Sequence, residues 1–107
     1  MKIDVIAVKS DDDIYLLKIE EIIALQVDGD YLVIMTKDNS YRMRERLYKM
    51  KGRLPTDQFV QVSKQALIHL DYLQMMEASF SGNMLAILTN RIKIVISRRY
   101  VKNLEEK

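Results

Sequence analysis

Short hydrophobic segments separated by polar turns make up most of the chain. Their length and their content of β-branched residues are typical of strands, which we expect over residues 3–8, 14–19, 22–27, 31–36, 41–43 and 59–62. Residues 66–68 and 70–75 are expected to form a bent pair of strands, and a turn over 81–83 to join segment 73–80 to a strand over 84–88. Residues 91–96 alternate regularly, with Ile92, Ile94 and Ile96 on one face. The pattern therefore predicts a mainly β protein.

Two segments have a helical pattern instead. Apolar residues recur at helical spacing across residues 44–54, and Pro55 follows as a stop signal. The stripe consists of Met43, Leu47, Met50 and Leu54. Ser97 is a candidate N-cap for a short helix over 98–105. We expect one helix in the middle of the chain and one at its end.

Length and composition narrow the class of protein. The chain has 107 residues, which fits a single domain over 1–107. It has no cysteine, which excludes disulfides and thiolate sites and fits a cytoplasmic location. It has a single histidine, which excludes a metal site made of several histidines within one chain. No catalytic set of nucleophile and base and no Gly-rich phosphate loop is found, so we expect no enzyme activity and no cofactor. No apolar run approaches about 18 residues, so no membrane span is expected.

Charge is divided unevenly along the chain. Residues 1–38 hold four basic and nine acidic side chains, whereas residues 39–107 hold thirteen basic and six acidic ones. The basic excess is concentrated in residues 41–54 and 91–102. This distribution indicates a basic face suited to a polyanion, although two solvated faces that keep the protein soluble would produce the same count.

Three segments of the chain follow one another in the order and at the spacing found in a known domain family. Residues 22–31 run from an apolar strand through Asp28-Gly29-Asp30 to Tyr31, residues 59–70 begin with Phe59 and contain Ser63-Lys64-Gln65, and residues 94–100 read Ile-Val-Ile-Ser-Arg-Arg-Tyr. Together with the basic helix that carries Leu47 and Leu54, they resemble the LytTR family of bacterial DNA-binding domains. The resemblance extends over essentially the whole chain.

The resemblance implies an elongated stack of small antiparallel sheets with one middle helix and a short C-terminal helix. In this family, loops rather than a recognition helix enter successive major grooves of double-stranded DNA and bend it. Carried over position by position, the residues that contact bases are Arg99, Lys64 and Asp30. Arginine suits guanine, lysine acts as a flexible donor, and a carboxylate can accept from the amino group of cytosine.

Other polar side chains near these positions are candidates for the DNA backbone. Hydroxyl and amide groups can bind phosphate oxygens and set register, whereas basic groups neutralise phosphate charge. The candidates are Ser63, Gln65, Ser97, Arg98, Lys102, Lys93, Arg42 and Arg44. The last three depend on which way their faces point.

Three positions depart from the usual family residues. Ser63 stands in place of His, Gln65 in place of Ser, and His69 in place of Asn. These changes bear on the target sequence more than on the fold. His69 lies between two apolar residues and is interpreted as a hydrogen-bonded, half-buried side chain rather than as a ligand.

The function that this combination favours is that of a bacterial transcription regulator. In this family the domain is commonly the output half of a two-component response regulator, so a receiver domain or, for a stand-alone chain, a regulatory protein is the implied partner. Family members usually bind paired direct repeats, which implies two protomers per DNA site. The alternatives are a small β protein-interaction module whose basic patches are non-specific and, less well supported, a reader of single strands that stacks bases on its scattered tyrosines.

Overall fold

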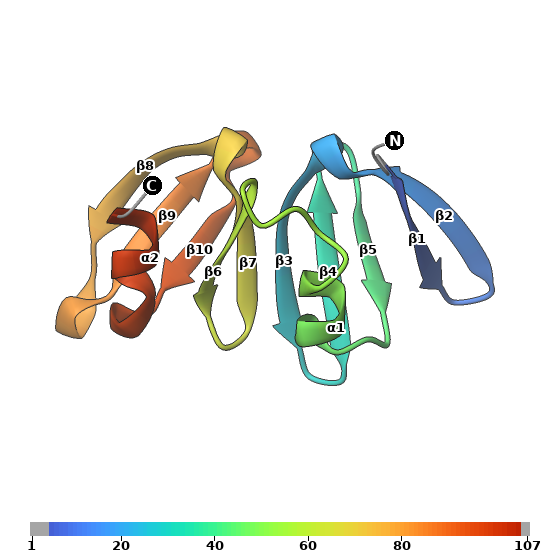
Figure 1. Cartoon of the computed structure of the whole chain (residues 1–107), viewed down its shortest axis with the longest axis horizontal. Helices are drawn as coiled ribbons and strands as arrows, with labels where there is room; N and C mark the ends of the chain where they lie inside the picture. Colours follow the sequence, from blue (N-terminus) through green and yellow to red (C-terminus); the bar gives the residue numbers. More distant parts are fainter. Residues whose placement is uncertain (1–4, 106–107) are drawn as a thin grey trace.

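The computed structural model describes residues 5–105, in which ten strands form three antiparallel sheets. The sheets lie side by side along the longest axis of a molecule that measures 41 × 33 × 24 Å (Figure 1). The first is a hairpin of β1 (Val5–Ser10) and β2 (Asp13–Lys18). The expected architecture, an elongated stack of small sheets, is confirmed. Residues 3 and 4 of the first predicted strand lie outside the described residues.

The central sheet has five strands in the order β5-β4-β3-β7-β6. Their bounds are β3 (Ile22–Asp28), β4 (Tyr31–Thr36), β5 (Ser40–Met43), β6 (Phe59–Ser63) and β7 (Ala66–His69). Short turns join β3 to β4, β4 to β5 and β6 to β7, so these neighbours are antiparallel. Gly29, in the turn between β3 and β4, has a φ of 64° that side chains disfavour.

The third sheet has the order β10-β9-β8, formed by β8 (Leu73–Ala78), β9 (Met84–Leu88) and β10 (Lys93–Ile96). The predicted alternation of the last strand is confirmed, because Ile94 and Ile96 are buried whereas Lys93 and Val95 are exposed. Strand β10 begins two residues later than expected. Asn90 and Arg91 have positive φ values of 63° and 61° and belong to the turn that precedes it.

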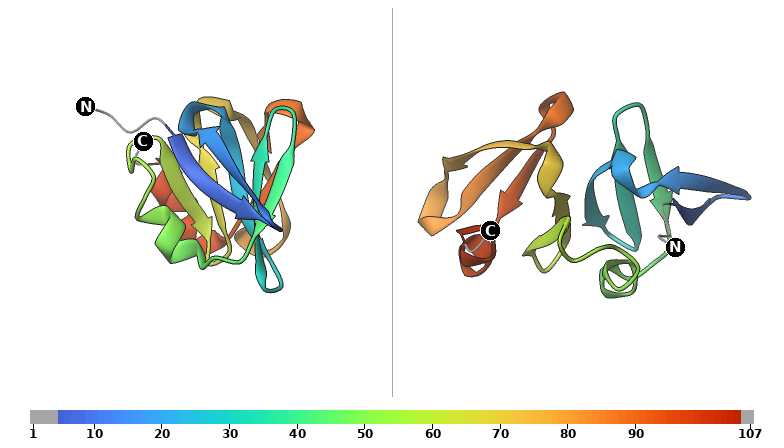
Figure 2. Two further views of the ribbon diagram at one scale, coloured as in Figure 1. Left: turned by 90° about the vertical axis from the view of Figure 1, so that its right-hand side faces the viewer. Right: turned by 45° about the horizontal axis from the view of Figure 1, so that its top comes forward.

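The two helices are shorter than the pattern predicted. Helix α1 spans only Leu47–Lys51, and Arg46 before it is extended, so the predicted helix over 44–54 is wrong at both ends. Helix α2 spans Val101–Glu105 and follows a 3-10 turn over Arg98–Tyr100. Ser97 occupies the expected N-cap position directly before this 3-10 turn, but its hydroxyl makes no cap hydrogen bond. Both helices lie on the same side of the row of sheets (Figure 2).

The central sheet is buried on both faces, which explains why β3 is an almost continuous apolar run. Leu25 packs with the hairpin and α1, in a cluster that includes Val8 and Met50. Its neighbour Ala24 points the other way, into a cluster shared with Ile96 of the third sheet. Alternate residues of one strand thus serve two cores.

The chain changes sheets at residues 70–72, where the sequence predicted a bent strand pair. Strand β7 ends at His69 and pairs with β3 and β6, whereas β8 begins at Leu73 and pairs with β9. A 3-10 turn, Leu70–Tyr72, separates them. The two strands therefore do not pair with each other, and the prediction was wrong on this point.

His69, at the end of β7, is more deeply buried than predicted. Only 1% of its surface is exposed, and its ring lies between the rings of Phe59 and Tyr72, with centroids 4.6 and 5.0 Å away. Its Nε2 lies 3.3 Å from Oε1 of Gln58, and its Nδ1 has no partner. Burial lowers the pKa of His69, and the partly opposing effect of Asp71 is smaller.

Candidate nucleic-acid interface

Three turns that carry the predicted base-contacting residues lie along one edge of the molecule, the lower edge in Figure 1. They are the β3–β4 turn with Asp30, the β6–β7 turn with Lys64, and the segment after β10 with Arg99. Backbone hydrogen bonds connect them. The amide of Val27 donates to the carbonyl of Gln65 at 2.8 Å, and the amide of Ser97 donates to the carbonyl of Val62 at 2.8 Å. The relative positions of the three turns are therefore set by the backbone.

The β3–β4 turn is braced by two arginines from β5 and the residue after it. Nη1 of Arg42 lies 2.8 Å from Oδ2 of Asp28, and the Arg42 guanidinium lies 4.8 Å from the centre of the Tyr31 ring. The Arg44 guanidinium lies 5.2 Å from the same ring. The ion pair is exposed and so stabilises the turn only modestly. It also offsets the charge of Arg42, which leaves Arg44 as the cation better placed for a ligand.

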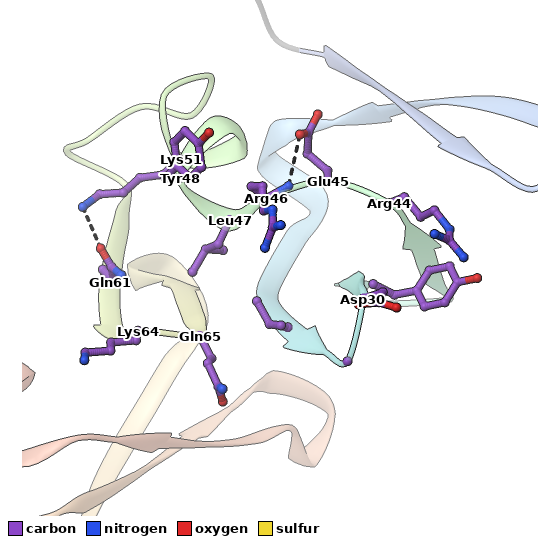
Figure 3. A pocket seen from close by; sticks show the side chains of 13 residues that line it. Asp30, Arg44, Glu45, Arg46, Leu47, Tyr48, Lys51, Gln61, Lys64 and Gln65 are labelled. Carbon is purple, nitrogen blue, oxygen red and sulfur yellow. Dashed lines mark hydrogen bonds between the residues drawn. The ribbon is translucent and has the colours of Figure 1, made fainter.

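A groove of about 790 Å³ separates the β3–β4 turn from the β6–β7 turn (Figure 3). Its walls include four predicted site residues, which are Asp30, Arg44, Lys64 and Gln65. They also include basic and aromatic residues that the sequence did not single out as site residues, namely Arg46, Tyr48 and Lys51. Cations outnumber the two carboxylates of the lining, so the groove is suited to an anion.

Helix α1 and the residue directly before it, Arg46, bring the unpredicted residues to this groove. Leu47 and Met50 are buried, so the intervening Tyr48 is turned outward and is 71% exposed. Nζ of Lys51 donates to Oε1 of Gln61 on β6 at 2.8 Å, which ties the helix to the neighbouring strand. The apolar spacing of the helix contained a signal for these positions, because residues between the stripe positions face away from the core.

The β6–β7 turn presents Lys64 and Gln65 to solvent. Ser63 is only half-exposed, and its Oγ accepts a hydrogen bond from the amide of Gln65 at 3.1 Å. In this conformation Ser63 supports the turn, since one of its acceptor positions is already used within the chain.

The third turn carries exposed Arg98 and Arg99 and half-exposed Ser97. The amide of Arg98 donates to Oδ1 of Asn83 at 3.0 Å, which fixes this segment to the turn between β8 and β9. Lys102 is exposed in the first turn of α2. Arg98, Arg99 and Lys102 therefore form a basic group beside the C-terminal end of β10.

Lys93 is not part of this edge. It begins β10 and pairs with Ile87, whereas Ile96, next to Ser97, pairs with Met84 at the other end. Three residues of strand separate them by about 10 Å. Lys93 thus lies toward the opposite edge, on the outer face of the third sheet.

The described part of the chain contains no group of three or more His, Asp or Glu side chains that could hold a metal ion. None of its helices is long and apolar enough to cross a membrane.

Comparison with known proteins identifies the fold and the family. Residues 12–107 match the family model of the LytTr DNA-binding domain. Among solved structures, a LytTr DNA-binding domain from Bacillus cereus superposes with a TM-score of 0.87 at 12% identity, covering 98% of this chain and 96% of that one. At this identity the superposition establishes the fold alone.

Curated relatives are sensory transduction proteins and transcriptional regulators of bacteria. LytT of Enterococcus faecalis is 29% identical over 106 residues, which are 99% of this chain and 44% of that protein. LytR of Streptococcus mutans is 28% identical over 88 residues, 82% of this chain and 36% of that protein. The chain thus spans about two fifths of the length of these relatives. Because the family model matches nearly all of its residues, the chain belongs to the LytTr DNA-binding domain family.

Proposed function

We propose that this domain reads a specific sequence in double-stranded DNA with three turns that enter major grooves, and that it regulates bacterial transcription by doing so. The observation that supports this proposal best is the connection of the three turns by the hydrogen bonds of Val27 and Ser97. Side chains of Asp30, Lys64 and Arg99 are all exposed on the edge that results. The edge therefore presents all three side chains to a ligand that spans the three turns.

Each turn would offer a different chemistry to the bases. Arg99 can donate two hydrogen bonds to O6 and N7 of guanine, a pair that is worth about 1–3 kcal/mol of discrimination. Lys64 can donate to guanine from a flexible stem. Asp30 can accept from the amino group of cytosine, and Arg44, on the wall of the same groove, would offset its repulsion from phosphate.

The basic groups around the turns would hold the DNA backbone. Arg44, Arg98 and Lys102 are exposed and suited to phosphate, and Gln65 can donate to a phosphate oxygen. Arg42 would act through the turn, since it is paired with Asp28. Ser63 and Ser97 are only half-exposed and would make weaker contacts to the DNA backbone. Lys93 is left out of the interface because it lies toward the other edge.

We further propose that two copies bind paired direct repeats, and that a receiver domain or a separate regulatory protein controls the domain. These proposals rest on the family, whose curated members are longer than this chain. The protein-interaction alternative is supported by one observation, which is the exposure of Ile14 and Leu16 on the outer face of the hairpin, at 66% and 70%. A regulatory partner would be a natural occupant of such a face.

Selection of binders from a random pool of duplex DNA tests the proposal directly. A repeated motif should emerge that binds about a thousandfold more tightly than random duplex. Titrations at several salt concentrations would then count the neutralised phosphates, because the slope of log affinity against log salt is near −0.9 per contact. Weak binding with no sequence preference would contradict the proposal and favour the protein-interaction alternative.

A further inference from the structure

A single aromatic side chain stands out at the turn between β8 and β9. Phe80 is 87% exposed, more than any other large hydrophobic residue described. It is the first residue of a short 3-10 turn, Phe80–Gly82. The turn is at the end of the third sheet that also carries the 3-10 turn Arg98–Tyr100, which contains Arg99 (Figure 1). A large apolar ring in this position is kept in water by the fold of the chain.

The turn itself is well defined. The amide of Asn83 donates to the carbonyl of Phe80 at 3.0 Å, and the amide of Ser79 donates to the carbonyl of Asn83 at 2.9 Å. Ser81 and Gly82 both have positive φ values, 57° and 82°. A turn closed in this way holds Phe80 in one place, because its backbone amides and carbonyls are paired across the loop.

Contacts to Arg98 connect this turn to the third predicted DNA-contacting turn. Oδ1 of Asn83 accepts from the amide of Arg98 at 3.0 Å. Gly82 lies so close to the Arg98 side chain that a Cβ on Gly82 would meet Cδ of Arg98 at 2.6 Å. The turn that carries Phe80 is therefore in contact with Arg98 through Gly82 and Asn83. Arg99, the predicted base contact, is the next residue after Arg98.

We propose that the β8–β9 turn is a fourth DNA-contacting turn, in which Phe80 covers the methyl group of a thymine in the major groove beside the base bound by Arg99. This inference rests on the proposed function and adds to it an apolar determinant of specificity. The thymine methyl group is the apolar feature that distinguishes base pairs in the major groove. Phe80 carries no charge, so its contribution is independent of phosphate contacts.

The experiment compares Phe80→Ala with the wild-type protein on the duplex that selection identifies. The variant should bind about tenfold more weakly, which corresponds to the loss of roughly 55 Å² of covered apolar surface. The slope of log affinity against log salt should stay the same, because that slope counts phosphate charges alone. Met75→Ala is the matched control, since Met75 is 51% exposed on β8 and lies outside the turn. It should bind as the wild type does.

Replacing each thymine of the duplex by uracil, one at a time, locates the contact. One replacement should weaken the wild-type protein and have no further effect on Phe80→Ala. If every uracil duplex weakens the two proteins equally, the thymine contact is refuted. The proposal also fails if Phe80→Ala binds the selected duplex as tightly as the wild type.

These failures are distinguishable from failure of the proposed function. In the latter case the wild-type protein itself would show no preferred duplex. Thermal unfolding of Phe80→Ala should match the wild type, since a side chain that is 87% exposed buries little surface in the free protein. Phe80→Leu, which keeps an apolar side chain, should lose less affinity than Phe80→Ala.

Discussion

The three glycines of the chain form a graded series of substitutions to alanine. Gly82 has a φ of 82°, and an added Cβ would lie 2.6 Å from Cδ of Arg98. Gly29 has a φ of 64° with nothing within 4 Å of the added atom, and Gly52 has an ordinary helical φ of −66°. The series thus separates backbone strain with a collision, backbone strain alone, and neither.

The expected free energies follow from these geometries. A non-glycine residue in the left-handed region costs about 1–2 kcal/mol, so Gly29→Ala should lower the free energy of unfolding by that amount. Gly82→Ala should lower the free energy of unfolding by at least as much, because the Arg98 side chain must also move away from the added Cβ. Gly52→Ala should stabilise the protein by about 0.4–1 kcal/mol, since alanine restricts the unfolded chain and fits the helical backbone.

Thermal unfolding followed by circular dichroism measures the series. A destabilisation of 1 kcal/mol lowers Tm by about 4–8 °C in a domain of nearly this size, so Gly82→Ala should melt roughly 5–15 °C below the wild type. Gly52→Ala should melt at or above the wild-type temperature. If Gly82→Ala and Gly52→Ala had the same Tm, the left-handed turn and its contact with Arg98 would be refuted.

Four further predictions concern DNA binding, self-association and pH. Arg99→Ala should weaken binding to the selected duplex and flatten preference at one base position, and unchanged affinity and preference would exclude Arg99 as a base contact. Lys102→Ala should weaken binding to all duplexes and reduce the salt slope by about 1, which titrations on selected and random DNA would show. Without DNA, analytical ultracentrifugation should find only weak self-association, and a tight dimer would contradict this expectation. Because burial lowers the pKa of His69 below its ordinary value of 6.5, the unfolded chain takes up the proton first. The stability of the wild-type protein to urea should therefore be greatest above about pH 7 and should decrease as the pH falls through the range between the unfolded and the folded pKa of His69. His69→Asn should lack this part of the pH dependence. Equal pH dependence in the two proteins would refute the prediction.

The sequence predicted the strands best where one physical rule acts alone. The alternation of β10 follows from one buried face, and the apolar run of β3 follows from burial on both faces. For residues 44–54, the spacing of apolar residues predicted a helix that is too long. There the strand residue Met43, the helix residue Met50 and the loop residue Leu54 all face one core, so a strand end, a short helix and a loop together imitate a longer helix.

The candidate site was less accessible to prediction than the fold. The three turns were located through the family resemblance, but the groove between the β3–β4 turn and the β6–β7 turn depends on how β6 lies next to α1, which no local pattern encodes. Lys51 reaches the groove because it is bonded to Gln61 across ten residues of sequence. Likewise, Lys93 and Arg98 belong to the same basic stretch, and only the course of β10 shows that they lie toward opposite edges.

Under the proposed function, the hydrogen bonds from Val27 to Gln65 and from Ser97 to Val62 bear on how this edge would recognise DNA. They make the distances between the turns a fixed property of the protein, so the spacing of the bases that the turns would contact is fixed as well. Inserting one base pair between two contacted bases would shift the second by about 3.4 Å and rotate it by roughly 34°, and the turns could not follow. The edge would therefore discriminate between DNA sites by the number of base pairs between the contacted bases, in addition to the identity of those bases.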